Sequence, residues 1–339
     1  MRLIKTEDAV GHVLCHDMTQ IIKDQYKDAR FRKGHVVTEE DIPVLLSMGK
    51  EHLYVWEMTS GMVHENDAAE RLLALCGQEN MIRSGVKEGK IELKAACDGV
   101  FLVDSARLVA VNSQDEVMIA TRKGGMAVRE GDKLAGMRVI PLIIEEEKLR
   151  KAEQAAGDKP LLSLKPYVRK TACIVATGDE VKKGLIKDTF TPVVIDKLKT
   201  YGIETLEVVY SGDGVENVRD AVLTMREKKP DMILCTGGMS VDPDDNTPGG
   251  IKAAGANIIA YGAPVLPGAM FLLGYFDDGM PVMGLPGCVM YAGATVFDLV
   301  LPKIAADVPV TRADLAALGE GGLCLGCKPC HYPICPFGK

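Results

Sequence analysis

The chain reads Thr171-Ala-Cys-Ile-Val-Ala-Thr-Gly-Asp-Glu180 at the point that decides its fold. The continuous apolar run at 172–176 is typical of a strand that a parallel sheet buries on both faces. Similar runs follow at 232–235 and 281–285, and residues 215–228 between them have helical spacing with acids first and bases last. Strands that alternate with helices in this way predict an α/β domain with a mostly parallel, three-layer sheet.

The rest of the chain predicts further domains, because 339 residues are too many for one ordinary core. The run of Glu, Lys, Gln and Ala at 145–158 predicts a solvated helix or a stiff linker that ends at Gly157. We therefore place a boundary near Lys159. The expected parts are a mixed α+β, strand-rich region at 1–158 with room for two subdomains, the α/β domain at 159–306, and a tail at 307–339.

Local patterns predict several elements in the strand-rich region. Residues 38–49 and 64–76 have apolar residues at helical spacing. Short apolar runs at 99–103, 107–111 and 117–120 are punctuated by Gly and Asp, which is typical of strands joined by tight turns.

Charge and composition exclude several kinds of partner. The formal net charge of −7 argues against a nucleic acid, whose phosphates need a basic surface. No apolar run is long enough to span a bilayer, and the start at 1–8, which turns acidic at Glu7, lacks the apolar core of a signal peptide. We therefore expect a cytoplasmic protein without a membrane partner, in which the ten cysteines do not form a secreted-type disulfide framework.

Three loops rich in glycine and small polar residues follow the predicted strands, at the sheet edge where such folds bind ligands. They lie at 177–180, 236–245 and 284–288. Glycine lets the backbone approach a ligand closely, and a helix that starts after such a turn adds unpaired N–H groups, so the loops predict a phosphate site. Alone, the first and third loops are more often ordinary turns and the second is a turn as often as a site, and only their combination favours a site. Acids that could hold a divalent cation beside the phosphate are Asp179, Glu180, Asp242, Asp244 and Asp245.

The three loops together resemble a known family. Thr177-Gly-Asp-Glu180, Thr236-Gly-Gly-Met-Ser-Val241 with Asp245, and Leu285-Pro-Gly287 are similar to the signature loops of the molybdopterin-binding domain. The adenylyltransferases and molybdotransferases of molybdenum cofactor biosynthesis share that domain. The resemblance extends over 164–303, and its motifs are specific because three separated loops match in order.

The resemblance implies a ligand, a metal and roles for individual residues. The ligand would be molybdopterin or adenylated molybdopterin, with Mg²⁺ and molybdate as further reactants, in a protein that forms a homo-oligomer and meets other biosynthesis proteins. Asp245, Asp179 and Glu180 would be catalytic, and Asp179 and Asp245 would be the Mg²⁺ ligands. The residues that would bind the pterin and its phosphate are Thr177, Gly178, Thr236, Gly237, Gly238, Met239, Ser240, Pro286 and Gly287.

The sequence departs from the molybdotransferase pattern in ways that leave two functions open. Asp242 replaces a glycine, Ala269 replaces a phosphate-pairing lysine, and Cys288 replaces an asparagine. The missing lysine would cost roughly 1–3 kcal/mol of charge-assisted binding. The Met-Asp-Gly segment of that family has no counterpart at 1–158. The first hypothesis is a molybdotransferase-like enzyme. The second is a non-catalytic carrier that delivers the cofactor to a molybdenum enzyme.

Four cysteines crowd into the tail as Cys324-Leu-Gly-Cys327-Lys-Pro-Cys330-His-Tyr-Pro-Ile-Cys335. The spacing resembles the cysteine run of bacterial ferredoxins with one extra residue before the last cysteine, which implies an iron–sulfur cluster. Zinc on the four thiolates, with His331 in exchange for one of them, is an alternative. A flexible tail without metal and a redox-responsive regulator are the other interpretations.

Overall fold

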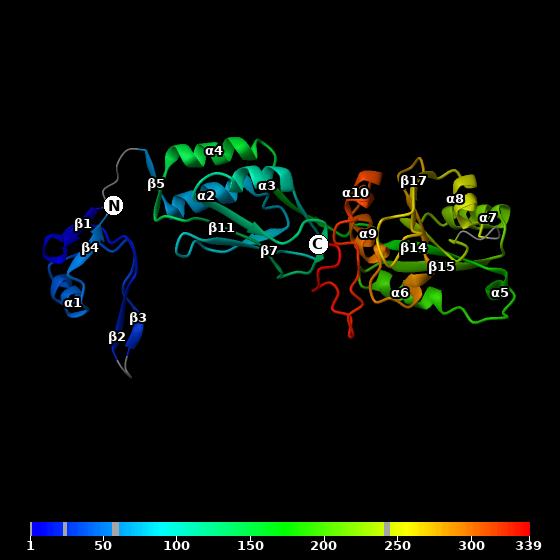
Figure 1. The fold of residues 1–339 in the computed structure, drawn as a ribbon, viewed down its shortest axis with the longest axis horizontal. Helices are drawn as coiled ribbons and strands as arrows, with labels where there is room; N and C mark the ends of the chain where they lie inside the picture. Colours follow the sequence, from blue (N-terminus) through cyan, green and yellow to red (C-terminus); the bar gives the residue numbers. More distant parts are fainter. Residues whose placement is uncertain (1, 23–25, 56–60, 241–244) are drawn as a thin grey trace.

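The computed structural model describes residues 2–22, 26–55, 61–240 and 245–339 (Figure 1). Its buried apolar side chains fall into separate clusters, which we use to name the N-terminal unit (2–55), the middle unit (61–166) and the α/β unit (171–305). Residues 307–339 are called the tail. No described helix has both the length and the apolar character needed to cross a membrane.

The N-terminal unit is small and closes around its own core, in which Leu14, Leu45 and Leu53 are fully buried. The helix predicted at 38–49 is confirmed as α1, which begins at Asp41. Two antiparallel strand pairs, β1 with β4 and β2 with β3, complete the unit. Its elements are β1 (Arg2–Lys5), β2 (Met18–Ile22), β3 (Tyr26–Phe31), α1 (Asp41–Ser47) and β4 (His52–Val55).

The middle unit is a mixed α+β structure with sheet orders β6-β7-β11-β9, β10-β8-β13 and β12-β5. The strand-rich prediction for this region is confirmed. Its elements are β5 (Met62–His64), α2 (Glu65–Leu75), β6 (Met81–Arg83), β7 (Ile91–Ala95), β8 (Gly99–Val103), α3 (Ser105–Asn112), β9 (Val117–Thr121), β10 (Met126–Val128), β11 (Lys133–Val139), β12 (Ile143–Glu145), α4 (Glu146–Ala156) and β13 (Leu162–Pro166).

One local prediction for the middle unit is wrong and a second is confirmed only in part, and each outcome has a physical reason. Residues 107–111 form helix α3 instead of a strand, because the Asp104 carboxylate caps the helix by accepting the Arg107 N–H at 3.0 Å. The run at 145–158 does form a helix, α4, but Leu149 and Ala152 are fully buried against the unit's core, so it is not a free linker. Strand β13 follows the boundary expected near residue 159 and pairs with β8 of the middle unit.

The α/β unit is built on a six-stranded sheet with the order β15-β14-β16-β19-β18-β17. Neighbouring strands from β15 to β19 are parallel, and β18 is antiparallel to both of its neighbours, so five of the six strands run one way. The mostly parallel sheet is therefore confirmed. Its strands are β14 (Thr171–Thr177), β15 (Glu204–Ser211), β16 (Met232–Thr236), β17 (Asn257–Tyr261), β18 (Leu272–Tyr275) and β19 (Pro281–Leu285).

Helices cover both faces of this sheet, which confirms the three layers. Successive side chains of a strand point to opposite faces. Accordingly Ala172 and Ile174 join the core beneath α6 and α9, whereas Cys173 and Val175 join the core beneath α7 and α8. The helices are α5 (Asp179–Lys182), α6 (Phe190–Lys199), α7 (Val215–Glu227), α8 (Thr247–Ala253) and α9 (Val296–Ala305).

The tail packs onto the α/β unit, and the interpretation of a flexible tail is therefore wrong. After α10 (Arg312–Ala317) the chain returns along α9, where Phe337 is only 2% exposed and belongs to the main core. The Tyr332 hydroxyl donates to the Asp298 carbonyl oxygen at 3.0 Å, and Leu323 forms a β-bridge with Leu266. Figure 1 shows the last residue lying between the middle unit and the α/β unit.

Candidate functional site

The site lies at the carboxyl ends of β14, β16 and β19, which are neighbours in the sheet. The register pairs Ala176 with Thr236, and Thr236 with Leu285, so the three predicted loops emerge side by side. Loops two and three line a cavity of about 480 Å³ together with Ala269 and Met270. The first loop does not line this cavity but contacts the second loop through Thr177. The lining residues predicted from the sequence are Gly237, Gly238, Met239, Ser240, Asp245, Pro286 and Gly287.

Gly237 makes the second loop possible because its backbone has a φ of +85°. A Cβ at this position would lie 2.4 Å from the Thr177 carbonyl oxygen, which no side chain can tolerate. The next residue, Gly238, has a φ of +56°, and a Cβ there would lie 2.6 Å from the hydroxyl oxygen of Thr247. A side chain at Gly238 would thus disrupt the loop's support before it could enter the cavity.

Two buried threonine hydroxyls, those of Thr177 and Thr247, form a network that ties the first loop to the second. The Thr177 hydroxyl donates to the Thr236 carbonyl oxygen at 3.0 Å and lies 3.1 Å from the Thr247 hydroxyl. Thr247 in turn donates to the Gly237 carbonyl oxygen at 2.9 Å. Thr247 was not predicted from the sequence, although a Thr-Pro pair at the start of a helix is a recognisable signal.

Asp245 closes the second loop on itself. One of its carboxylate oxygens accepts the Ser240 N–H at 2.8 Å. The Tyr261 hydroxyl, which was also not predicted, donates to the Met239 carbonyl oxygen at 3.0 Å. Burial and the negative charge of Asp245 raise the pKa of Tyr261, so this donor stays protonated. The two other acids of this loop, Asp242 and Asp244, lie outside the described residues.

Asp179 and Glu180 begin α5 at the end of the first loop and do not line the cavity. The Asp179 N–H donates to the Asp213 carboxylate at 3.1 Å, and the Lys183 ammonium donates to Asp179 at 2.5 Å. This ammonium holds the pKa of Asp179 below its usual range. Asp213 follows β15 and was missed because no motif marks it. Among the described residues, no three His, Cys, Asp or Glu side chains are placed to share a metal ion.

The cavity wall is mostly apolar and rich in sulfur. Met239, Met270, Met290 and Tyr291 line it beside Cys288, whose pKa is raised by burial. None of the described lining residues is a lysine or an arginine. A phosphate group at this site would therefore depend on backbone N–H groups and on a bound cation.

The four tail cysteines are not gathered into a metal-binding group in the described structure. Cys327 and Cys330 are exposed, whereas Cys324 and Cys335 are partly buried against the main core. The Cys330 sulfur lies against Gly293, where a Cβ would come within 2.8 Å of it. The tail thus contacts the segment that leads from the third loop to α9.

Two sequence families match parts of the chain. Residues 3–57 match the family described as "Domain of unknown function (DUF8806)". Residues 173–306 match the family described as "Probable molybdopterin binding domain". The second match covers all three loops and the α/β sheet except the first two residues of β14.

Similar proteins match over short segments. The "CinA-like protein" of Mycobacterium tuberculosis (strain ATCC 25177 / H37Ra) is 33% identical over 76 residues, which are 22% of this chain and 18% of that protein. "Protein PYRAB15930" of Pyrococcus abyssi is 30% identical over 74 residues, which are 22% of this chain and 29% of that protein. This chain thus spans less than a third of the length of either relative.

Solved structures similar to this chain cover about two fifths of it. The molybdopterin biosynthesis enzyme MoaB from Thermus thermophilus has a TM-score of 0.36 and 17% identity, over 42% of this chain and 98% of that one. A structure of MogA has a TM-score of 0.36 and 22% identity, over 41% of this chain and 100% of that one. On the family match and the three loops, residues 173–306 form a probable molybdopterin-binding domain.

Proposed function

We propose that this chain is a molybdotransferase-like enzyme that holds molybdopterin, free or adenylated, in the 480 Å³ cavity and acts on it with Mg²⁺ and molybdate. The observation that carries the proposal is the second loop. Its two left-handed glycines turn the backbone beneath the cavity, and the buried threonine network holds that turn in place. A rigid turn of this kind presents backbone N–H groups to an anion without a side chain in the way.

The apolar wall fits the other end of the proposed ligand. Met270, Met290 and Tyr291 offer polarizable and aromatic surface to a flat heterocycle. Pro286 and Gly287 complete the third loop at the same cavity, so both predicted contacts of that loop lie where a pterin would bind. We therefore assign the phosphate to the second loop and the ring to this wall.

Asp245 is the acid best placed to hold Mg²⁺, because its carboxylate lies at the cavity and carboxylate oxygen is the ligand that this ion prefers. When bound, Mg²⁺ would neutralise phosphate charge that no lysine balances here. Asp245 would then orient the metal and the phosphoryl group, and Ser240 would keep that carboxylate fixed. Asp179 and Glu180 would extend the acidic edge of the site from the first loop.

The alternative is a non-catalytic carrier of the finished cofactor. Ala269 favours this alternative, since it lines the cavity at the position where the molybdotransferase pattern has a lysine. A carrier needs affinity for the pterin but no transition-state stabilisation. Asp245 separates the two functions, because only the enzyme needs it for turnover.

The test compares Asp245→Ala with wild-type protein under anaerobic conditions, with Asp196→Ala as a control on the exposed surface of α6. Calorimetry with molybdopterin should show affinities of Asp245→Ala and wild type within about tenfold, which is about 1.4 kcal/mol. Turnover, measured as AMP release or molybdate insertion, should be lost only in Asp245→Ala. Wild-type protein that binds the pterin without turnover would establish the carrier. Wild-type protein that does not bind it would refute both functions.

We also propose that Cys324, Cys327, Cys330 and Cys335 bind zinc or an iron–sulfur cluster when the metal draws them together. The spacing supports this, and Cys327 and Cys330 are exposed. Anaerobically purified protein should contain iron or zinc, and Cys327→Ser and Cys330→Ser should remove it while the core stays folded. Neither metal above background, with all four thiols open to alkylation, would reject the site. We also expect a homo-oligomer, which gel filtration with light scattering tests by measuring the molar mass in solution.

A further inference from the structure

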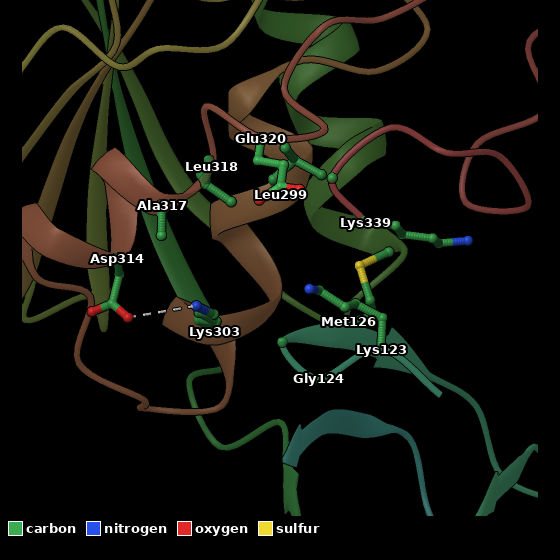
Figure 2. Close-up of a pocket in the computed structure, with 12 residues that line it drawn as sticks. Lys123, Gly124, Met126, Leu299, Lys303, Asp314, Ala317, Leu318, Glu320 and Lys339 are labelled. Carbon is green, nitrogen blue, oxygen red and sulfur yellow. Dashed lines mark ion pairs between the residues drawn. The ribbon is translucent and has the colours of Figure 1, made fainter. Parts of the chain in front are cut away.

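A second cavity lies where three parts of the chain meet, far in sequence from the three loops. It has a volume of about 270 Å³ and lies between the turn that joins β9 to β10, the helices α9 and α10, and the last residues of the tail (Figure 2). The turn belongs to the middle unit, and the helices belong to the α/β unit and the tail. A ligand here would therefore contact both units at once.

The turn approaches α9 closely at Gly125. A Cβ on this residue would lie 3.2 Å from the Cε of Lys303, so the lysine stem lies against the glycine backbone. The Lys303 side chain is only 21% exposed as a result. This packing holds its ammonium group at the cavity instead of letting it extend into solvent.

The cations of this cavity differ in how far their neighbours neutralise them. Lys303 lies 4.0 Å from Oδ1 of Asp314. The other oxygen of that carboxylate, Oδ2, accepts the Thr311 N–H at 2.8 Å and the Thr311 hydroxyl at 2.6 Å in the cap of α10. Lys123 has no carboxylate partner within the described part of the chain. Lys339 donates to a carbonyl oxygen, that of Pro333.

The lining as a whole contains three lysines and two acids, Asp314 and Glu320, in a chain whose net charge is −7. In Figure 2 the Lys123 and Lys303 side chains approach the cavity from opposite units. Positive charge gathered in a small hollow of an acidic protein attracts anions. Lysine ammonium groups bind compact oxyanions as point charges, without the planar geometry that arginine requires.

We propose that this cavity binds a small tetrahedral oxyanion, either a free one or the phosphate of a small ester, between Lys123 and Lys303. A water molecule occupies about 30 Å³ in the liquid, so 270 Å³ holds such an anion and several waters but no large cofactor. The bound anion would link the middle unit to the α/β unit through one lysine from each. The proposal is independent of the pterin site, with which this cavity shares no lining residue.

The test uses the full chain and isothermal titration calorimetry at constant ionic strength. The ligands are inorganic phosphate, sulfate, molybdate and glycerol phosphate, and chloride controls for nonspecific screening. We expect one saturable site. Lys123→Met and Lys303→Met keep the apolar stem and should each weaken binding by about tenfold or more, because each removes a charged donor. Lys151→Met, on the exposed side of α4, should bind like wild type.

The relative affinities of the four ligands identify the kind of anion bound, and two results would overturn the proposal. Tighter binding of glycerol phosphate would identify a phosphorylated metabolite as the ligand, and tighter binding of an inorganic ion would identify a free oxyanion. Lack of saturable binding by all four ligands would overturn the proposal. So would wild-type affinity in both Lys123→Met and Lys303→Met, since binding would then occur elsewhere. Thermal unfolding of each variant in ligand-free buffer confirms that lost binding is not lost folding.

Discussion

Replacing Thr247 with valine tests whether the buried hydroxyl network holds the second loop in place. Valine has nearly the same shape, and Thr247 is only 1% exposed, so little else should change. The substitution removes the donor to the Gly237 carbonyl oxygen at 2.9 Å and the contact with the Thr177 hydroxyl at 3.1 Å. A buried acceptor that loses its donor costs about 1–3 kcal/mol. The free energy of unfolding should fall by that amount.

Thermal denaturation and calorimetry with molybdopterin measure the two consequences. For a unit of this size the melting temperature should fall by about 2–4 °C per kcal/mol. Affinity should fall by about tenfold or more, because the loop no longer keeps one conformation. Thr247→Ser is the matched control: it loses a methyl group worth about 1 kcal/mol but keeps the hydroxyl, and should keep the affinity. Wild-type affinity in Thr247→Val, or equal losses in both variants, would refute the role of the network.

Two further predictions concern stability. Phe337→Ala should lower the free energy of unfolding, measured by chemical denaturation, by about 3–5 kcal/mol, because this tail residue is buried in the main core. Leu325→Ala, at a position 74% exposed, should stay within about 0.5 kcal/mol of wild type. Equal small effects of the two substitutions would show that the tail is not docked. Burial alone would raise the pKa of Asp231, but the N–H groups of Lys170 and Thr171 outweigh it and hold the pKa below its usual value. Its contribution is therefore present above about pH 4 and lost as pH falls, so the stability difference between wild type and Asp231→Asn should shrink from about pH 7 to about pH 3; a constant difference would contradict this.

The centre of the α/β sheet could be predicted from the sequence because its strands are buried on both faces. Continuous apolar runs at 172–176, 232–235 and 281–285 are typical of such strands in a βαβ pattern. Strand β19 was predicted on this basis, but β17 and β18 were not. Strand β17 lies at the edge of the sheet and is half exposed, so its apolar pattern is weak. Strand β18 is buried between β19 and β17 but is only four residues long. In the middle unit, the valines at 107–111 suggested a strand, but these residues form helix α3, whose first turn is capped by Asp104.

Some residues of the site could be predicted from local sequence motifs, whereas others depend on contacts between residues far apart in the sequence. Glycines and acids at the strand ends were visible as motifs, because a turn is specified by residues that are adjacent in sequence. The groups that fix those turns were not. Thr247 lies 70 residues from Thr177, Tyr261 lies 22 residues from Met239, and Asp213 lies 34 residues from Asp179. Only the fold brings such partners together.

The structure distributes positive charge in a way that bears on both cavities. The cavity of about 480 Å³ has Asp245 and no lysine or arginine among its described lining residues, whereas the smaller cavity has three lysines. A phosphate in the first would be held by oriented backbone N–H groups, whose positions the threonine network fixes. An anion in the second would be held by the ammonium groups of lysine side chains. Rigid dipoles cost little to organise on binding, while lysines lose conformational freedom and are screened by salt. The first cavity is therefore suited to specific recognition, and the second to reversible binding that responds to the concentration of the anion.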